Sequence, residues 1–110
     1  MINYTTPTIT LTVEGVDIST GFDVYATLEQ GAKNITKNGA DLTLTAETVG
    51  EFTKTTIEFA LTQEESALFD YGRSCYAQVN WLDEHLKRAA TDIKAIPVMR
   101  NLLNEVIGII

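Results

Sequence analysis

The sequence predicts an all-β sandwich of about seven antiparallel strands with one short crossover helix near residues 63–69. Polar and apolar residues alternate through most of the first 61 residues, as in TITLTV and DLTLTAET, and this period of two is typical of strands with one buried face. Threonine, whose β-branched side chain favours strands, occurs 16 times, 15 of them before residue 63. Turn signals recur about every 8–12 residues, which favours a sandwich.

The alternation assigns a core face to each expected strand. In the first strand Ile9, Leu11 and Val13 share the inward side. The dipeptide Asn38-Gly39 is typical of a type I′ turn and predicts a hairpin between the strands on either side of it. Pro97 places the last strand at a sheet edge or a bulge. The strands are expected at 8–13, 23–29, 33–37, 42–46, 53–61, 73–82 and 87–98.

The segment LTQEESALF interrupts this alternation, and we interpret it as the connection between the two sheets. Thr62 can cap a helix, and Glu65 three residues later completes a capping box. Leu68 and Phe69 are expected to close the end of the core, and Gly72 to end the turn. The helix is therefore expected to be a lid, which requires no catalytic role for its acidic residues.

Composition argues against several classes of partner. The formal net charge is −7, from 15 acidic and 8 basic residues, and the basic residues are not clustered. Nucleic acids and anionic membrane surfaces are bound mainly through basic groups, so neither is expected as a partner. A single cysteine forms no internal disulfide, MINYTTPT does not have the pattern expected of a signal peptide, and no apolar run in this sequence approaches the ~20 residues that a membrane helix needs. We expect a protein made in the cytoplasm, without membrane insertion.

Few residues are candidates for catalysis or metal binding. His85, the only histidine, stands beside Asp83 and Glu84 in an expected turn, and a solvated histidine is favoured over an acid–base centre. Cys75 is expected to face the core as a small apolar residue. One histidine and one cysteine do not form a closed zinc site, and DISTGFD lacks the glycine and the bidentate acid of a calcium loop. We predict no catalytic residue, no cofactor and no metal.

Two tyrosines are candidates for a binding face. Tyr25 and Tyr76 fall on the outward phase of their expected strands. If these strands are neighbours, the rings form an exposed aromatic platform that could stack on sugars or anchor a protein interface. The alternative is that they are ordinary surface tyrosines of a sheet.

The final segment, NLLNEVIGII, is the other candidate interface. The spacing of Leu103, Val106, Ile107 and Ile110 predicts an apolar helical stripe. It either covers an open sheet edge of its own domain or docks on another subunit. We therefore divide the chain into a sandwich at 1–98 and an apolar tail at 99–110. The expected interface residues are Leu102, Leu103, Val106, Ile107, Ile109 and Ile110.

The segment IEFALTQEESALFDYGRSCYAQVNWLD resembles the immunoglobulin-like N-terminal domain of phage baseplate upper proteins, and small proteins encoded in prophage structural-gene clusters. The likeness extends along residues 8–98. It implies an immunoglobulin-like sandwich without catalytic residues. The residues that carry it are Leu61, Thr62, Glu64, Glu65, Phe69, Gly72 and Trp81.

The expected function is that of a non-enzymatic phage or prophage structural component, of tail or baseplate type. It would act through assembly with itself, as a homo-oligomer, or with other phage structural proteins, and would reside in the virion once assembled. The alternative is a carbohydrate- or cell-surface-binding module that uses Tyr25 and Tyr76. An enzyme centred on His85 is the least favoured hypothesis.

Overall fold

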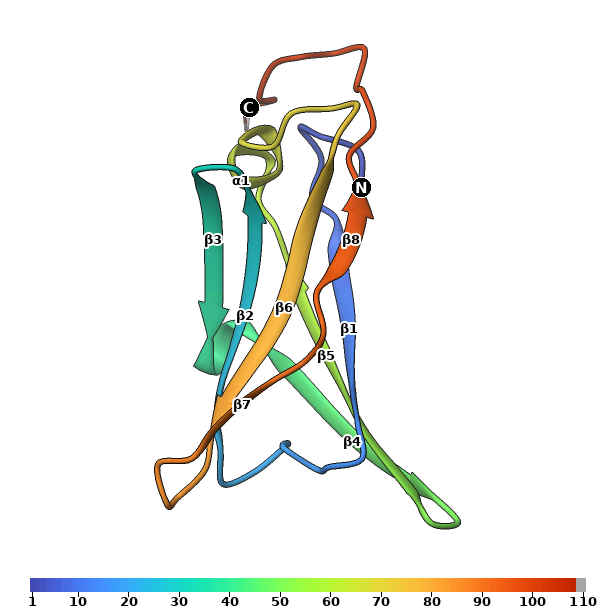
Figure 1. Ribbon diagram of the computed structural model, residues 1–110. Helices are drawn as coiled ribbons and strands as arrows, with labels where there is room; N and C mark the ends of the chain where they lie inside the picture. Colours follow the sequence, from blue (N-terminus) through green and yellow to red (C-terminus); the bar gives the residue numbers. More distant parts are fainter. Residues whose placement is uncertain (109–110) are drawn as a thin grey trace.

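The computed structural model describes residues 1–108, and Ile109 and Ile110 lie outside the described range. These residues form an all-β sandwich with one short helix, which confirms the predicted fold class (Figure 1). The strands are β1 (Thr8–Glu14), β2 (Asp23–Gln30), β3 (Lys33–Asn38), β4 (Thr43–Val49), β5 (Phe52–Ala60), β6 (Ser74–Leu82), β7 (Arg88–Ala90) and β8 (Lys94–Pro97); α1 spans Gln63–Ala67 and a 3-10 turn, η1, spans Gly39–Asp41.

The two sheets have the strand order of an immunoglobulin-like sandwich. One sheet has the order β1-β5-β4, and the other has β3-β2-β6 with β7 and β8 both paired to β6. These are the positions of strands B, E, D and C′, C, F, G in that architecture. The position of strand A beside β1 is not filled by the described residues, because Ile2 forms a parallel bridge with Met99 instead. β1 is therefore an edge strand.

The core lies between the sheets and is formed by the predicted alternate positions. Leu28, Ile57 and Val79 are completely buried, and each comes from the middle of a central strand. Trp81 is half-buried and packs against this core near the end of β6. The other fully or nearly fully buried apolar residues are Ile9, Leu11, Val13, Ile18, Val24, Ala26, Ile35, Leu42, Phe59, Leu61, Phe69, Cys75, Ala77 and Val98.

The hairpin predicted at Asn38-Gly39 does not form, so that prediction was wrong. β3 pairs with β2, whereas β4 pairs with β5 in the opposite sheet. A type I′ turn needs positive φ at both central residues, but Asn38 is extended with φ −153° and only Gly39 is left-handed with φ 56°. The chain passes through η1 and buries Leu42, so this segment is a crossover between the sheets.

The single strand expected at 87–98 is divided into β7 and β8. Between them Thr91 makes three hydrogen bonds with β6: its N–H donates to the Val79 carbonyl at 2.9 Å, its Oγ1 accepts from the Val79 N–H at 3.1 Å, and its carbonyl accepts from the Gln78 side chain at 2.8 Å. The hydroxyl replaces a backbone partner and interrupts the ladder. Pro97 lies in β8, which pairs on one side only, so its predicted edge position is confirmed.

Helix α1 crosses between the sheets as predicted and has the predicted capping box. The Glu65 N–H donates to Thr62 Oγ1 at 3.1 Å, and the Thr62 N–H donates to Glu65 Oε1 at 3.0 Å. Phe69 closes the core with 1% of its surface exposed, but Leu68 is 47% exposed, so its predicted core contact was wrong. Leu68 is the C-cap of α1 and Phe69 follows it, and because these successive side chains point in different directions only Phe69 faces the core.

Buried polar side chains fasten the loops at this end of the sandwich. The Gln30 amide donates to the Asp70 carbonyl at 3.0 Å and accepts from the Asp70 N–H at 2.6 Å. Ser66 Oγ donates to the Thr5 carbonyl at 2.6 Å. Both side chains are buried, and hydrogen bonding of buried polar groups avoids a desolvation penalty of about 1–3 kcal/mol each.

Candidate interaction surfaces

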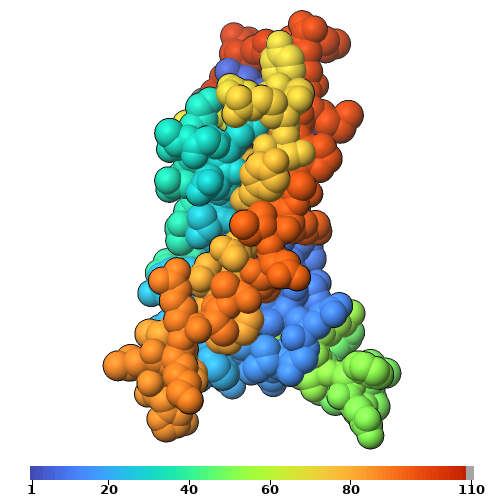
Figure 2. Space-filling model, in the orientation of Figure 1, coloured from blue at the N-terminus to red at the C-terminus, as the bar shows by residue number. Residues whose placement is uncertain are grey.

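Two loops project from the end of the sandwich opposite α1 (Figure 1). One is the turn between β4 and β5, and the other is the loop between β6 and β7. The space-filling view shows them as separate projections at the base of the molecule, coloured green and orange (Figure 2). Both carry exposed apolar side chains, including Phe52 in the first and Leu86 in the second.

The β4–β5 projection, residues 47–54, is here named the hairpin arm. Val49 and Phe52 face each other across its tip and are 69% and 83% exposed. Gly50, with φ 63°, permits the tight turn between them. The arm protrudes because its pairing with β1 ends at Glu14 and Lys54, so its tip has no third strand beside it. The tip side chains consequently have no core to enter.

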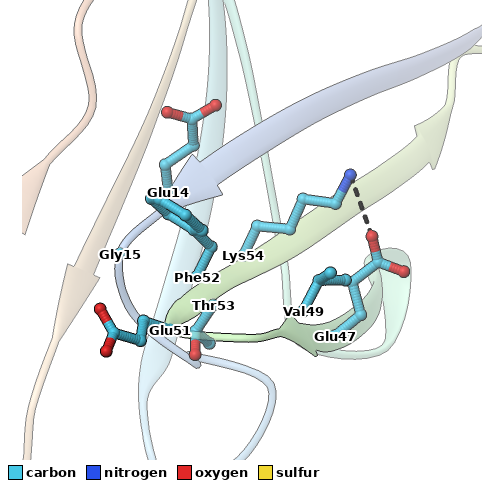
Figure 3. Close-up of a pocket in the computed structure, with 8 residues that line it drawn as sticks. All are labelled: Glu14, Gly15, Glu47, Val49, Glu51, Phe52, Thr53 and Lys54. Atoms are coloured by element: carbon cyan, nitrogen blue, oxygen red, sulfur yellow. Dashed lines mark ion pairs between the residues drawn. The ribbon is translucent and has the colours of Figure 1, made fainter.

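Carboxylates surround the apolar tip (Figure 3). Lys54 Nζ lies 3.0 Å from Glu47 Oε1, which neutralises one of them. Glu14 and Glu51 have no ion-pair partner among the described residues. Together these side chains line an open hollow of about 400 Å³. The arm therefore presents an aromatic ring within a net negative rim.

Phe52 is not among the candidate residues expected from the sequence, because the strand expected at 53–61 begins one residue after it, whereas β5 begins at Phe52. The available signal was the order Val-Gly-Glu-Phe, in which two large apolar residues flank a two-residue turn. Apolar residues in such positions sit at the tip of a hairpin, where they are buried only if another element covers them.

A second hollow lies on the outer face of the five-stranded sheet and is here named the sheet hollow. Tyr25 on β2 is directly opposite Asn80 on β6, and Arg88 on β7 is opposite Leu82. Arg88 Nε donates a hydrogen bond to Asn80 Oδ1 at 3.2 Å. The hollow measures about 450 Å³, and among residues 1–108 Arg88 is the one charged residue that lines it. Its lining is Tyr25, Thr27, Thr36, Asn80, Trp81, Leu82 and Arg88.

Tyr25 and Tyr76 lie on neighbouring strands and on the same sheet face. However, Tyr76 is opposite Glu29, four residues along β2 from Tyr25, which corresponds to about 13 Å. Tyr76 lines a separate small hollow with Glu29 and Ile93. The structure therefore does not bring the two rings together into one platform, and their role in binding stays a prediction.

The described part of the tail, residues 99–108, contains no helix, so the predicted helical stripe was wrong there. Val106, Ile107 and Gly108 have weak helix propensity, and isolated helices shorter than about 12 residues are marginal. The Gln63 amide instead holds the tail backbone, donating to the Ile107 carbonyl at 3.0 Å and accepting from its N–H at 2.8 Å. The tail thus passes over α1 rather than along an open sheet edge.

The tail side chains are exposed to different degrees. Leu102 and Ile107 are largely exposed, and Leu103 and Val106 are a little under half exposed. Ile109 and Ile110 lie outside the described residues. At the start of the tail, Asn101 is tied to the buried Asn3 by two hydrogen bonds of 3.0 and 3.1 Å. An interface role for the tail, and its separation from the sandwich as a unit, stay predictions.

The remaining candidates for chemistry have ordinary surroundings. His85 is exposed in the β6–β7 loop, where its backbone N–H donates to Asp83 Oδ1 at 2.8 Å and its ring lies 3.5 Å from Glu84. Burial raises the pKa of the Cys75 thiol, so at neutral pH it is protonated and unreactive. Hydrogen bonds from the Ser19 hydroxyl and N–H lower the pKa of Asp17, as expected for a capped turn.

Comparison with known protein families, with curated proteins and with solved structures finds no match to this chain. Across residues 1–108 no helix is long and apolar enough to cross a membrane. Within the same range, no group of three or more histidine, cysteine, aspartate or glutamate side chains is placed to hold a metal ion.

Proposed function

We propose that this chain is a non-enzymatic assembly subunit, a structural component of phage or prophage tail or baseplate type that associates with copies of itself. The observation that carries the assembly role is Phe52, held 83% exposed at the tip of the hairpin arm. Burial by a partner of an aromatic ring that the hairpin holds in water is favourable, and aromatic residues are enriched among those that dominate protein interfaces. The phage attribution rests on the resemblance of residues 57–83.

The charge of the chain suits such a role. A net charge of −7 keeps unassembled subunits apart in solution and so limits unspecific association of their exposed apolar residues. Assembly then requires contacts in which apolar and charged groups match locally.

The test is the solution mass, measured by sedimentation velocity and light scattering over a roughly hundredfold dilution. The solution mass of the full chain is compared with that of a chain ending at Arg100, which lacks the interface residues expected in the tail. We expect a defined oligomer that dissociates on dilution. A full chain that stays monomeric at every concentration would overturn self-assembly. Mass spectrometry of particles released on prophage induction in the encoding bacterium tests the phage attribution, which predicts the chain in purified particles.

A second candidate function is carbohydrate binding in the sheet hollow. It is favoured by the combination of the Tyr25 ring with the Asn80 amide and the Arg88 guanidinium, because sugars are held by aromatic stacking together with planar polar groups. NMR titration with a panel of oligosaccharides tests it. Binding that is lost in Tyr25→Ala but kept in Tyr76→Ala would support this function. No shift at Tyr25 or Asn80 with any sugar would remove it.

A further inference from the structure

We propose that the hairpin arm of one copy of this chain inserts Phe52 into the sheet hollow of a second copy. The inference rests on the proposed function and names the two surfaces through which the subunits would join. It follows from the match of two surfaces that the fold leaves uncovered in the single chain.

The apolar parts of the two surfaces correspond. The arm offers the adjacent pair Val49 and Phe52, and the hollow offers Tyr25 and Leu82 on its outer face. A volume of about 450 Å³ is large enough for a phenylalanine ring with part of its hairpin. A ring entering beside Tyr25 can adopt the edge-to-face or offset arrangement that aromatic pairs prefer.

The charges also correspond. Glu14 and Glu51 at the rim of the arm lack an ion-pair partner among the described residues, and Arg88 is the only charged residue lining the hollow. Arg88 uses its Nε to bond Asn80, which fixes the orientation of the guanidinium and leaves its terminal nitrogens for a carboxylate. In a chain of net charge −7, most random encounters bring acid against acid, so this pairing is selective.

The positions of the two surfaces limit the types of assembly. The arm belongs to the three-stranded sheet, whereas the hollow lies on the outer face of the five-stranded sheet. Two different patches in contact either exchange reciprocally between two copies, which gives a two-fold dimer, or make a head-to-tail interface, which closes into a ring or continues as a filament. A hairpin tip buries less than the ~800 Å² per partner of a standard interface, so one contact is weak and ring closure strengthens it.

The experiment measures self-association of the full chain by sedimentation velocity in three single variants. Phe52→Ala and Arg88→Glu are each expected to raise the dissociation constant about tenfold or more. The matched control is Leu86→Ala, which removes a side chain that is 79% exposed on the neighbouring loop and belongs to neither surface. It is expected to leave association unchanged. Circular dichroism verifies the fold of each variant, and Arg88→Gln replaces Arg88→Glu if the latter is destabilised.

A charge exchange tests the pairing directly. Glu51→Arg alone should weaken association, because it places two positive charges together, and adding Arg88→Glu in the same chain should restore at least part of it. An oligomer that persists in both Phe52→Ala and Arg88→Glu overturns this inference and leaves the proposed assembly role intact. A wild-type chain that is monomeric at all concentrations overturns both. A loss of association in Leu86→Ala as large as that in Phe52→Ala also overturns the inference. It would show that the contact spreads over the whole end of the sandwich opposite α1.

Discussion

The two ends of the sandwich differ in how far their loops are held by contacts within the chain. At the α1 end, side-chain amides and hydroxyls bond the backbone of loops distant in sequence, as Gln30 does with Asp70 and Ser66 with Thr5. At the opposite end, the hairpin arm and the β6–β7 loop extend into solvent with Phe52 and Leu86 uncovered. The loops of the α1 end are fastened by bonds within the chain, although tail residues such as Leu102 stay exposed there, whereas the opposite end presents its apolar side chains on two projecting loops. We infer that the projecting loops of the second end take part in association, while an interface role for the tail stays a prediction.

The largest expected effect comes from comparing two phenylalanines. Phe69→Ala removes a side chain that closes the core at the α1 end and should lower the free energy of unfolding by about 3–5 kcal/mol. Phe52→Ala removes an exposed ring and should change it by less than about 0.5 kcal/mol. Urea denaturation of both variants measures the difference. A large decrease in the free energy of unfolding of Phe52→Ala would mean that the arm is part of the core. It would also remove the contrast between the two ends.

An intermediate effect on stability is expected when the side-chain amide of Gln30, at the α1 end, is removed. Gln30→Leu leaves the Asp70 N–H and carbonyl without their partner in a partly buried place and should lower the free energy of unfolding by about 1–2 kcal/mol. Gln63→Leu is the matched control, because the same two-bond contact there holds the exposed tail residue Ile107. It should cost only a few tenths of a kcal/mol, since water replaces the lost bonds. Thermal denaturation of both variants measures the difference. Equal losses of stability in Gln30→Leu and Gln63→Leu would show that the tail is as much a part of the fold as the loop that contains Asp70.

The smallest effect concerns pH. Partial burial raises the pKa of Glu65, but hydrogen bonds from Lys37 and the Thr62 N–H outweigh it, so its pKa is below the ordinary 4.5. A carboxylate with a lowered pKa contributes stability that is complete above the unfolded-state pKa and is lost as the pH falls through the folded-state pKa. The α1 end should therefore weaken below about pH 4.5, by less than about 1 kcal/mol.

Denaturation at a series of pH values in Glu65→Gln measures this contribution. The variant should lose less stability between pH 5 and 3 than the unmodified chain. Glu64→Gln, in the same helical turn but exposed, serves as the control and should leave the pH dependence unchanged. An identical pH profile in all three proteins would show that the Glu65–Lys37 pair, at 2.7 Å, contributes nothing measurable.

The elements of this fold with strong local signals could be predicted from the chain. The buried faces of β1, β2, β5 and β6 follow from alternation, because a pleated strand sends successive side chains to opposite sides. The capping box of Thr62 and Glu65 involves residues only three positions apart, so it too is local. Of the candidate surfaces, the outward positions of Tyr25 and Tyr76 were predicted in the same way.

The way in which these elements combine could not be predicted from local signals. Asn38-Gly39 has the composition of a hairpin turn, yet β3 and β4 join different sheets, because β3 forms a hairpin with the preceding strand β2 and β4 forms one with the following strand β5. The separation of Tyr25 from Tyr76 depends on the register between β2 and β6. Phe52 is exposed because β1 ends before the tip of the arm. Alternation along the chain is enough to predict which side chains face inward, because its period specifies a face of each strand. It does not predict which surfaces remain uncovered, because that depends on which strands become neighbours.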